Sequence, residues 1–240
     1  MYRGRRVLGI IPARGGSRRL QKKNIRHLCN KPLIGWTIDA ARNSKTLDEL
    51  VVSTEDVEVE KVVTALGLTE VIKRSSDLAS DDATINDVVV EVLNVMKKRG
   101  EKFDYIVLLQ PTSPLRTAEH VEGAFGLMET MDCSGVISVC RTEHPVEWTG
   151  KLGPDGFLDS FISNAELDKQ SQEFMPSYQI NGAIYVTPVD RFLKEKTLFL
   201  KSGMVAYVMD RASSVDIDDE YDLRLAAWLL GQRKKSITCD

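Results

Sequence analysis

Short apolar runs alternate with longer segments of helical periodicity along the first 140 residues of the chain. The run at residues 6–12 (RVLGIIP) is continuously apolar after its first residue, which is typical of a strand buried on both faces. Similar runs predict strands at residues 50–53, 70–73, 105–109 and 135–140. Helices are predicted between them at residues 31–44, 57–66, 84–98 and 117–131. This alternation predicts an α/β fold with a doubly wound, mostly parallel sheet.

The pattern breaks at about residues 141–180, where polar residues are frequent and no period is clear. A stretch of this length without regular structure is uncommon inside a compact domain, so we expect an arm that packs on a partner chain or a lid over a substrate. Beyond it, strands are predicted at residues 183–186 and 205–209, and helices at residues 189–193 and 218–230. The length suits one substantial core, and we treat residues 1–240 as a single domain with this arm.

Composition and charge narrow the class of protein. The formal net charge of −3 gives no global basic field of the kind that binds nucleic acid. No apolar run approaches the roughly 20 residues that span a bilayer, and the N-terminal apolar run is too short for a secretion signal. We therefore expect a cytoplasmic protein that binds neither nucleic acid nor membranes. The cysteines share no CxxC spacing, which argues against a zinc site, and we expect them to be reduced.

A glycine-containing loop, PARGGS at residues 12–17, follows the first predicted strand. Its two glycines permit positive φ angles and close approach of a ligand, and successive amides in such a turn form an anion-binding concavity. Arg14 and Ser17 add donors, and the surrounding basic residues are Arg18, Arg19, Lys22 and Lys23. The loop matches neither the dinucleotide fingerprint nor the P-loop. A solvated surface turn is the alternative, but ligands bind at the carboxyl ends of strands in open α/β sheets, so the position favours a phosphate site.

Two carboxylates precede the last predicted helix, at Asp216 and Asp218. In an extended segment, residues two apart point to the same side, so both carboxylates can meet one cation while Ile217 faces the core. Oxygen ligands of this kind suit Mg²⁺, which is shared with substrate phosphates. The alternative is that the aspartates cap the helix, which is plausible for Asp218 and Asp219. Asp216 lies too far upstream to cap, and this favours a metal site.

Two further segments carry polar side chains at the expected ligand-binding edge of the sheet. Gln110 follows a strongly apolar strand, and its amide can both donate and accept, which suits a sugar or a carboxylate. Asn181 and Tyr185 could reach the same edge from the NGAIY segment. Ordinary turn chemistry is the alternative for both segments.

These segments together resemble the acylneuraminate cytidylyltransferase family, also called CMP-sialate synthetases. The matching stretches follow the family's order and cover nearly the whole chain: IIPARGGS, KKNI, LASDD, LLQPTSPLR, NGAIY and SVDIDDE. The resemblance implies a Rossmann-like nucleotidyltransferase fold. It implies that the anomeric hydroxyl of an acidic α-keto sugar attacks the α-phosphate of CTP, giving a CMP-sugar and pyrophosphate. It also implies a homodimer, in which the segment at about residues 141–180 reaches across to the partner.

By position in these motifs, the resemblance implies a role for each candidate site residue. The triphosphate would be held by Arg14, Ser17 and Lys23, with the amides of Gly15 and Gly16. The nucleoside would be lined by Asn24, Arg74, Ala83 and Ile85. The sugar would be faced by Gln110, Asn181 and Tyr185. Mg²⁺ would be bound by Asp216 and Asp218, so the residues expected to carry catalysis are Arg14, Lys23, Asp216 and Asp218.

The arm departs from the family's pattern. Arginines usually precede NGAIY, as in RRQDLP followed by Tyr-Arg, but this chain reads QSQEFMP at residues 170–176 and then Tyr178-Gln179. The nucleotide half of the resemblance therefore transfers better than the sugar half, and the acceptor stays open among N-acetylneuraminate, legionaminate and a deaminated form. One alternative is another sugar nucleotidyltransferase of this architecture, for example of the 3-deoxy-manno-octulosonate type. A non-catalytic nucleotide-binding module is the other, and the retained metal pair argues against it.

Overall fold

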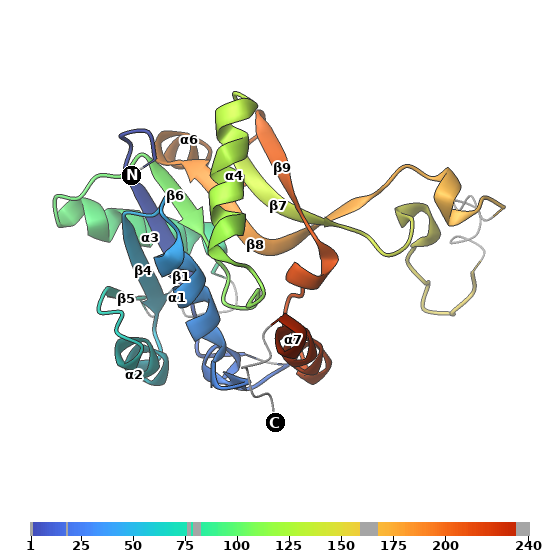
Figure 1. Cartoon of the computed structure of the whole chain (residues 1–240), viewed down its shortest axis with the longest axis horizontal. Helices are drawn as coiled ribbons and strands as arrows, with labels where there is room; N and C mark the ends of the chain where they lie inside the picture. Colours follow the sequence, from blue (N-terminus) through green and yellow to red (C-terminus); the bar gives the residue numbers. More distant parts are fainter. Residues whose placement is uncertain (1, 18, 76–77, 79–82, 159–167, 234–240) are drawn as a thin grey trace.

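The computed structural model describes residues 2–17, 19–75, 78, 83–158 and 168–233. Within them, a seven-stranded sheet has the order β5-β4-β1-β6-β8-β7-β9 (Figure 1). The strands are β1 (Val7–Pro12), β4 (Glu49–Thr54), β5 (Val71–Lys73), β6 (Tyr105–Leu108), β7 (Gly135–Arg141), β8 (Tyr178–Pro188) and β9 (Met204–Met209). Only β8 runs antiparallel to its neighbours in this sheet, and the other pairs are parallel. The expected mostly parallel sheet is therefore confirmed.

Helices cover both faces of the sheet. They are α1 (Leu33–Asn43), α2 (Val57–Ala65), α3 (Ile85–Lys98), α4 (Ala118–Thr130) and α6 (Val189–Glu195), whereas α7 (Glu220–Arg233) packs in a third apolar cluster with Leu28 and Leu33. Successive side chains of a strand point to opposite faces, so Ile11 of β1 packs in one core cluster and Ile10 in the other. The first cluster takes its helical side chains from α1, α2 and α4, and the second from α3 and α6. Helices on both faces of a mostly parallel sheet make the fold doubly wound.

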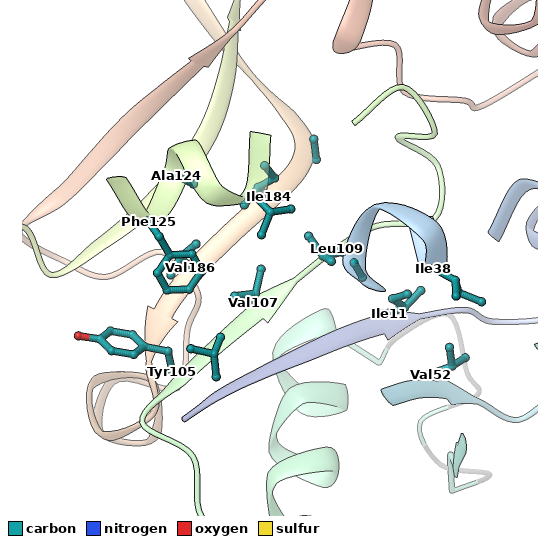
Figure 2. Packing of buried hydrophobic residues seen from close by; sticks show 14 of the residues in the cluster. Ile11, Ile38, Val52, Tyr105, Val107, Leu109, Ala124, Phe125, Ile184 and Val186 are labelled. Carbon is teal, nitrogen blue, oxygen red and sulfur yellow. The ribbon is translucent and has the colours of Figure 1, made fainter. Parts of the chain in front are cut away.

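Figure 2 shows how the first cluster joins the helices to the sheet. Phe125 of α4 lies against Val107 of β6 and Val186 of β8, while Ile38 of α1 lies near Ile11. Phe125 and Ile38 are at most 1% exposed. This continuous apolar contact holds the carboxyl ends of β1 and β6 side by side, and the loops that follow these strands build the site described below.

Two elements differ from the sequence prediction. The helix expected from residue 31 begins at Leu33, because Lys31–Pro32 forms β3 and pairs with β2 (His27–Leu28). The strand expected at residues 183–186 is the longer β8. The pairing of β8 with β7 shifts register around Gly182, whose φ is 72°. The polar residues at this irregularity interrupt the apolar pattern, so the pattern captured only the second half of the strand.

The irregular segment between β7 and β8 forms an arm that projects away from the sheet (Figure 1). Its described part contains two short 3-10 turns, η3 (Val146–Trp148) and η4 (Ser171–Glu173), while residues 159–167 lie outside the described residues. Large apolar side chains are exposed on the arm, among them Phe157 at 67% and Met175 at 87%. The expected dimerisation role of the arm stays a prediction, because the structure holds one chain.

Two expectations from composition can be compared with the structure. Across the described ranges, no helix combines the length and apolar character needed to cross a bilayer. Cys133 and Cys140 are free thiols, as expected, but Cys29 is disulfide-bonded, so the expectation of reduced cysteines was wrong there. Spacing along the chain does not reveal which cysteines the fold brings together.

Candidate active site

A cavity of about 480 Å³ opens where β1 and β6 end. The predicted site residues that line it are Arg14, Ser17, Lys23, Asn24, Arg74, Ala83, Ile85, Gln110, Asp216 and Asp218. Ligands bind at this position in open α/β sheets, beyond the carboxyl ends of the parallel strands. Gly15, Gly16, Asn181 and Tyr185 are not among the lining residues. Of the LASDD motif, residues 79–82 lie outside the described residues, and so does Arg18.

The loop after β1 is held from two sides. The side-chain amide of Asn24, which is 6% exposed, donates to the carbonyl oxygen of Arg14 at 2.8 Å. On the other side, the backbone amide of Gly15 donates to Oε1 of Glu55 at 2.7 Å. Arg14 therefore lies on the cavity wall with its backbone fixed at two neighbouring positions. Glu55 directly follows β4, so the strand-end argument that selected Arg14 could have selected it too.

The backbone of the two glycines in this loop gives little support to their expected contact with phosphate. Neither Gly15 nor Gly16 has a positive φ. The amide of Gly15 already serves a carboxylate, so its expected contact with phosphate is not supported by the geometry. A Cβ atom on Gly15 would lie 2.1 Å from Oδ2 of Asp56, whereas one on Gly16 would meet nothing within 4 Å. Close packing against Asp56 explains the first glycine, and nothing in the structure explains the second.

Lys23 connects this loop to the acidic segment before α7. Its Nζ donates to the carbonyl oxygen of Ile217 at 2.7 Å and to Oδ1 of Asp218 at 3.1 Å. Arg19, which the sequence analysis did not assign, forms an ion pair with Oδ2 of Asp218 at 2.9 Å. The cavity therefore places cationic side chains directly beside its carboxylates. This arrangement suits an anionic ligand that binds together with a cation.

Asp216 and Asp218 both face the cavity, and Ile217 between them is fully buried, as the extended-segment argument predicted. Asp216 is exposed as a residue, yet partial enclosure of its carboxylate raises its pKa above the ordinary 3.8; a hydrogen bond with Thr112 offsets part of this rise, and the nearby charge of Asp218 adds to it. Capping of α7 falls to other residues. Oδ1 of Asp219 accepts from the amides of Tyr221 and Asp222.

The acidic pair fits a divalent cation in its donor chemistry. Mutual repulsion between two carboxylates is relieved by a cation between them, and Mg²⁺ takes one or two carboxylates together with substrate phosphates and water. In the parts of the chain that the structure describes, no group of three or more His, Cys, Asp or Glu side chains could hold a metal ion. Asp216 and Asp218 could therefore hold the ion only with oxygen ligands from a bound substrate and water.

Arg74, which directly follows β5, lines another part of the cavity. It is 7% exposed, and Nη2 donates to the carbonyl oxygen of Ser53 at 3.1 Å. Burial lowers its pKa, which the charge of Glu55, 3.6 Å from Nη1, partly offsets. Beside it, Thr84 caps α3 through the amide of Asp87, and this cap brings Ala83 and Ile85 to the cavity. Thr84 and Val88 also line the cavity and were missed by the sequence analysis.

Gln110 enters the cavity from the loop after β6. Its Oε1 lies over Gly182, where an added Cβ would approach to 2.4 Å. The same Cβ would lie 3.8 Å from Oδ2 of Asp216. The irregularity in β8 therefore makes room for Gln110 next to the acidic pair, and bulges of this kind are common beside active sites.

The structure does not bring Asn181 into the cavity. Asn181 is 4% exposed, its Oδ1 accepts from the hydroxyl of Ser138 at 2.6 Å, and its Nδ2 donates to Oγ of Ser214 at 2.9 Å. Its amide thus cross-links β7, β8 and the segment after β9, because the irregular strand turns this side chain inward. This geometry therefore does not support the expected contact of Asn181 with a sugar, which stays a prediction.

Tyr185 is also absent from the cavity wall. It is 7% exposed and packs edge to face on Phe199, in the cluster beneath α3 and α6. Burial raises the pKa of its hydroxyl, and the charge of Asp216 raises it further. Tyr185 is therefore buried near Asp216 and does not reach the surface of the cavity.

Comparison of the sequence with known proteins finds matches to cytidylyltransferases. The family model described as cytidylyltransferase matches residues 8–146. The N-acylneuraminate cytidylyltransferase of Escherichia coli is 32% identical over 96% of the chain, which spans 53% of that protein. The CMP-N,N'-diacetyllegionaminic acid synthase of Legionella pneumophila is 32% identical over 97% of this chain and 99% of its own length. The pseudaminic acid cytidylyltransferase of Campylobacter jejuni is 29% identical, with 91% and 94% covered.

Solved structures agree at the level of the fold. A CMP:2-keto-3-deoxy-manno-octonic acid synthetase, solved in complex with CTP, superposes with a TM-score of 0.70 at 18% identity and covers 95% of this chain and 100% of its own. A 4-diphosphocytidyl-2C-methyl-D-erythritol synthase superposes with a TM-score of 0.65 at 15% identity, with 94% and 98% covered. The family match spans more than half of the chain and a full-length relative matches at 32% identity, so the chain belongs to the cytidylyltransferase family.

Proposed function

We propose that this protein transfers CMP from CTP to the anomeric hydroxyl of a nonulosonic acid, a sialic-type α-keto sugar, and releases pyrophosphate. The observation that carries the proposal is that one cavity brings the cations Arg14, Arg19 and Lys23 together with the acidic pair Asp216 and Asp218. The relatives that match over most of the chain are named for CMP transfer to sialic, legionaminic and pseudaminic acids. The octulosonate alternative is less well supported, since its 18% identity supports the fold alone.

The residues around the cavity divide into two ends. At the nucleotide end, Arg14, Ser17 and Lys23 bind the triphosphate, and the nucleoside lies against Asn24, Arg74, Ala83 and Ile85. Arginine matches phosphate oxygens in a bidentate fashion, and Lys23 is already oriented by its bond to Ile217. At the acceptor end, the amide of Gln110 orients the sugar next to Asp216.

The reaction needs positioning and charge neutralisation more than covalent participation by the protein. The acceptor hydroxyl forms a bond to the α-phosphorus, the bond from that phosphorus to the bridging oxygen of pyrophosphate breaks, and the hydroxyl proton leaves to solvent. Arg14 and Lys23 stabilise the negative charge that develops on the departing oxygens. Asp216 and Asp218 would hold Mg²⁺, which when bound neutralises phosphate charge. Gln110, which orients the sugar, keeps the acceptor hydroxyl at the face of the phosphate opposite the leaving group.

We further propose that the working form is a homodimer joined through the arm and the neighbouring strand ends. Ile180 of β8 and Val208 of β9 both pair with Val139 of β7, so the three side chains form one apolar row across three strands. Ile180 is 50% exposed and Val208 is 54% exposed in the single chain. A row of this kind supports contact with a second copy of the chain.

The test is pyrophosphate release from CTP and Mg²⁺ across a panel of acceptors. The panel contains N-acetylneuraminate, legionaminate, pseudaminate, a deaminated nonulosonate and 3-deoxy-manno-octulosonate. We expect release with at least one nonulosonate and little with the octulosonate. Absence of release with every nonulosonate would refute the proposal.

A matched pair of variants tests the acidic segment in the same assay. Asp218→Asn should lower kcat on the order of 100-fold, because it removes a charge that faces the phosphates. Asp219→Asn changes the neighbouring carboxylate, which caps α7, and should keep kcat within a few-fold. Equal effects of the two substitutions would contradict the role given to Asp218.

A further inference from the structure

Arg116 is a buried cation that the reaction described above does not use. It precedes α4 and is 2% exposed. Its Nη1 donates to the carbonyl oxygen of Gln110 at 3.2 Å and to that of Ala183 at 2.9 Å. Its Nε and Nη2 are buried without a hydrogen-bond partner in the described residues. Among those residues, no carboxylate forms an ion pair with Arg116.

A charge held in this way is costly for stability. Burial lowers the pKa of Arg116 to about 9, far below the 12.5 of an ordinary guanidinium. A buried charge without a partner is disfavoured, and apolar residues of similar volume are often at least as stable in such places. Stability alone therefore does not explain an arginine at this position. The two hydrogen bonds of Nη1, to the carbonyl oxygens of Gln110 and Ala183, suggest a functional reason.

One of the two carbonyl groups belongs to Gln110, which lines the acceptor end of the cavity, and the other belongs to Ala183, next to the Gly182 backbone over which the Gln110 side chain lies. Gln110 enters the cavity after β6, and Ala183 follows Gly182 in β8. The side chain of Gln110 lies over Gly182, so the relative position of these segments sets where its amide points. Arg116 is the side chain that bonds to both.

The acceptor end also needs positive charge. The cations that line the cavity, Arg14, Arg19, Lys23 and Arg74, come from the loop after β1 and the end of β5. The lining residues that adjoin Gln110 in sequence are Pro111 and Thr112, and neither is charged. An acidic sugar brings a carboxylate to this end, where an uncompensated guanidinium behind the wall favours it.

We propose that Arg116 is a positioning residue for the acceptor: its Nη1 clamps the carbonyl groups of Gln110 and Ala183, so that the amide of Gln110 is fixed over Gly182, and its charge favours an anionic sugar at that end of the cavity. The proposal rests on the proposed function, because it assigns Arg116 to the acceptor half of the same reaction. Arg116 does not touch the substrates and acts through Gln110.

Steady-state kinetics of Arg116→Met and Arg116→Lys test the proposal. For Arg116→Met we expect the acceptor KM to rise about ten-fold or more, with a lower kcat, while the CTP KM stays within about two-fold. Arg116→Lys keeps the charge and should show a smaller change in the same direction, and it carries the test if Arg116→Met does not fold. Arg191→Met removes another partly buried guanidinium, which bonds to Ser134 and Glu195, and should change neither KM. Equal rises in both KM values for an Arg116 variant, or no rise, would overturn the proposal.

Hydrogen exchange separates failure of this proposal from failure of the proposed function. Backbone amides at residues 109–116 and 182–185 should exchange faster in Arg116→Met than in the wild type, while those at residues 13–17 should not. The Arg191→Met protein should show no such change. If the wild type transfers CMP to no acceptor, the proposed function fails, and this measurement still decides whether Arg116 clamps the two segments. Unchanged exchange at both segments overturns the clamp.

Discussion

At the scale of single residues, the backbone of Gly15 is constrained by contact with Asp56. We expect Gly15→Ala to lower the free energy of unfolding by about 1–3 kcal/mol, because the new methyl group overlaps the carboxylate of Asp56. Asp56 also caps α2 by accepting from the amide of Glu58, so its displacement loosens that helix. Urea unfolding measures the change. Gly16→Ala, where the methyl group meets nothing within 4 Å, is the control, and equal losses in both variants would show that the contact with Asp56 is not the cause.

The same scale separates what the sequence could predict from what it could not. Arg14, Gln110 and Asp216 were placed correctly in the cavity. Each lies beyond the end of a strand or in an extended segment, where the position along the chain determines which way the side chain points. Asn181 was misplaced because it lies in the irregular part of β8, where alternation no longer determines which way a side chain points. Arg116 ends the matched stretch LLQPTSPLR but was assigned no role, because the sequence does not show that this side chain is buried.

At the scale of elements, the first turn of α3 depends on a capping box. Thr84 accepts from the amide of Asp87, and the carboxylate of Asp87 accepts from both the hydroxyl and the amide of Thr84. These bonds lower the pKa of Asp87 below 3.8. Because Ala83 and Ile85 line the nucleotide end of the cavity, the box also orders part of the proposed CTP site.

Asp87→Asn should therefore destabilise the protein in a pH-dependent way. A carboxylate with a lowered pKa contributes stability above its unfolded value of 3.8, and this contribution is lost as the pH falls through the lowered value. We expect a lower melting temperature for the variant at pH 7, a difference that shrinks below pH 3.8. Glu60→Gln, at an exposed position on α2, should show no such pattern. A constant difference across the whole range would contradict the proposed role of the charge.

The order of elements was predictable and the geometry of β8 was not. Strands such as β1 and β6 are apolar throughout because helices cover both of their faces, so their sequence alone identifies them. Strand β8 is antiparallel, changes register at Gly182 and continues onto an exposed arm, so its first half has no buried face to produce a pattern. The part of the fold that departs from regularity is also the part that shapes the acceptor end of the cavity.

At the scale of the whole molecule, the row in which the half-exposed Ile180 and Val208 flank the buried Val139 predicts self-association. One chain has a mass of 26.9 kDa, and we expect light scattering after size exclusion to give about twice that mass for the wild type at roughly 10 μM. Ile180→Lys combined with Val208→Lys should convert the dimer to a monomer, because a lysine on the row would have to be desolvated in the interface. The variant should retain its secondary structure by circular dichroism, since both side chains are half exposed in the single chain.

Leu193→Lys supplies the matched control, because Leu193 is a 40% exposed apolar side chain on α6, outside the arm and the row. It should leave the mass of the dimer unchanged. If it dissociates the protein as fully as the double substitution does, association is not specific to the row. A wild type that stays monomeric at every concentration would remove the basis for the dimer altogether. If the double variant is monomeric but keeps full transferase activity, the dimer exists without contributing to the site, and the cavity of one chain suffices for the reaction.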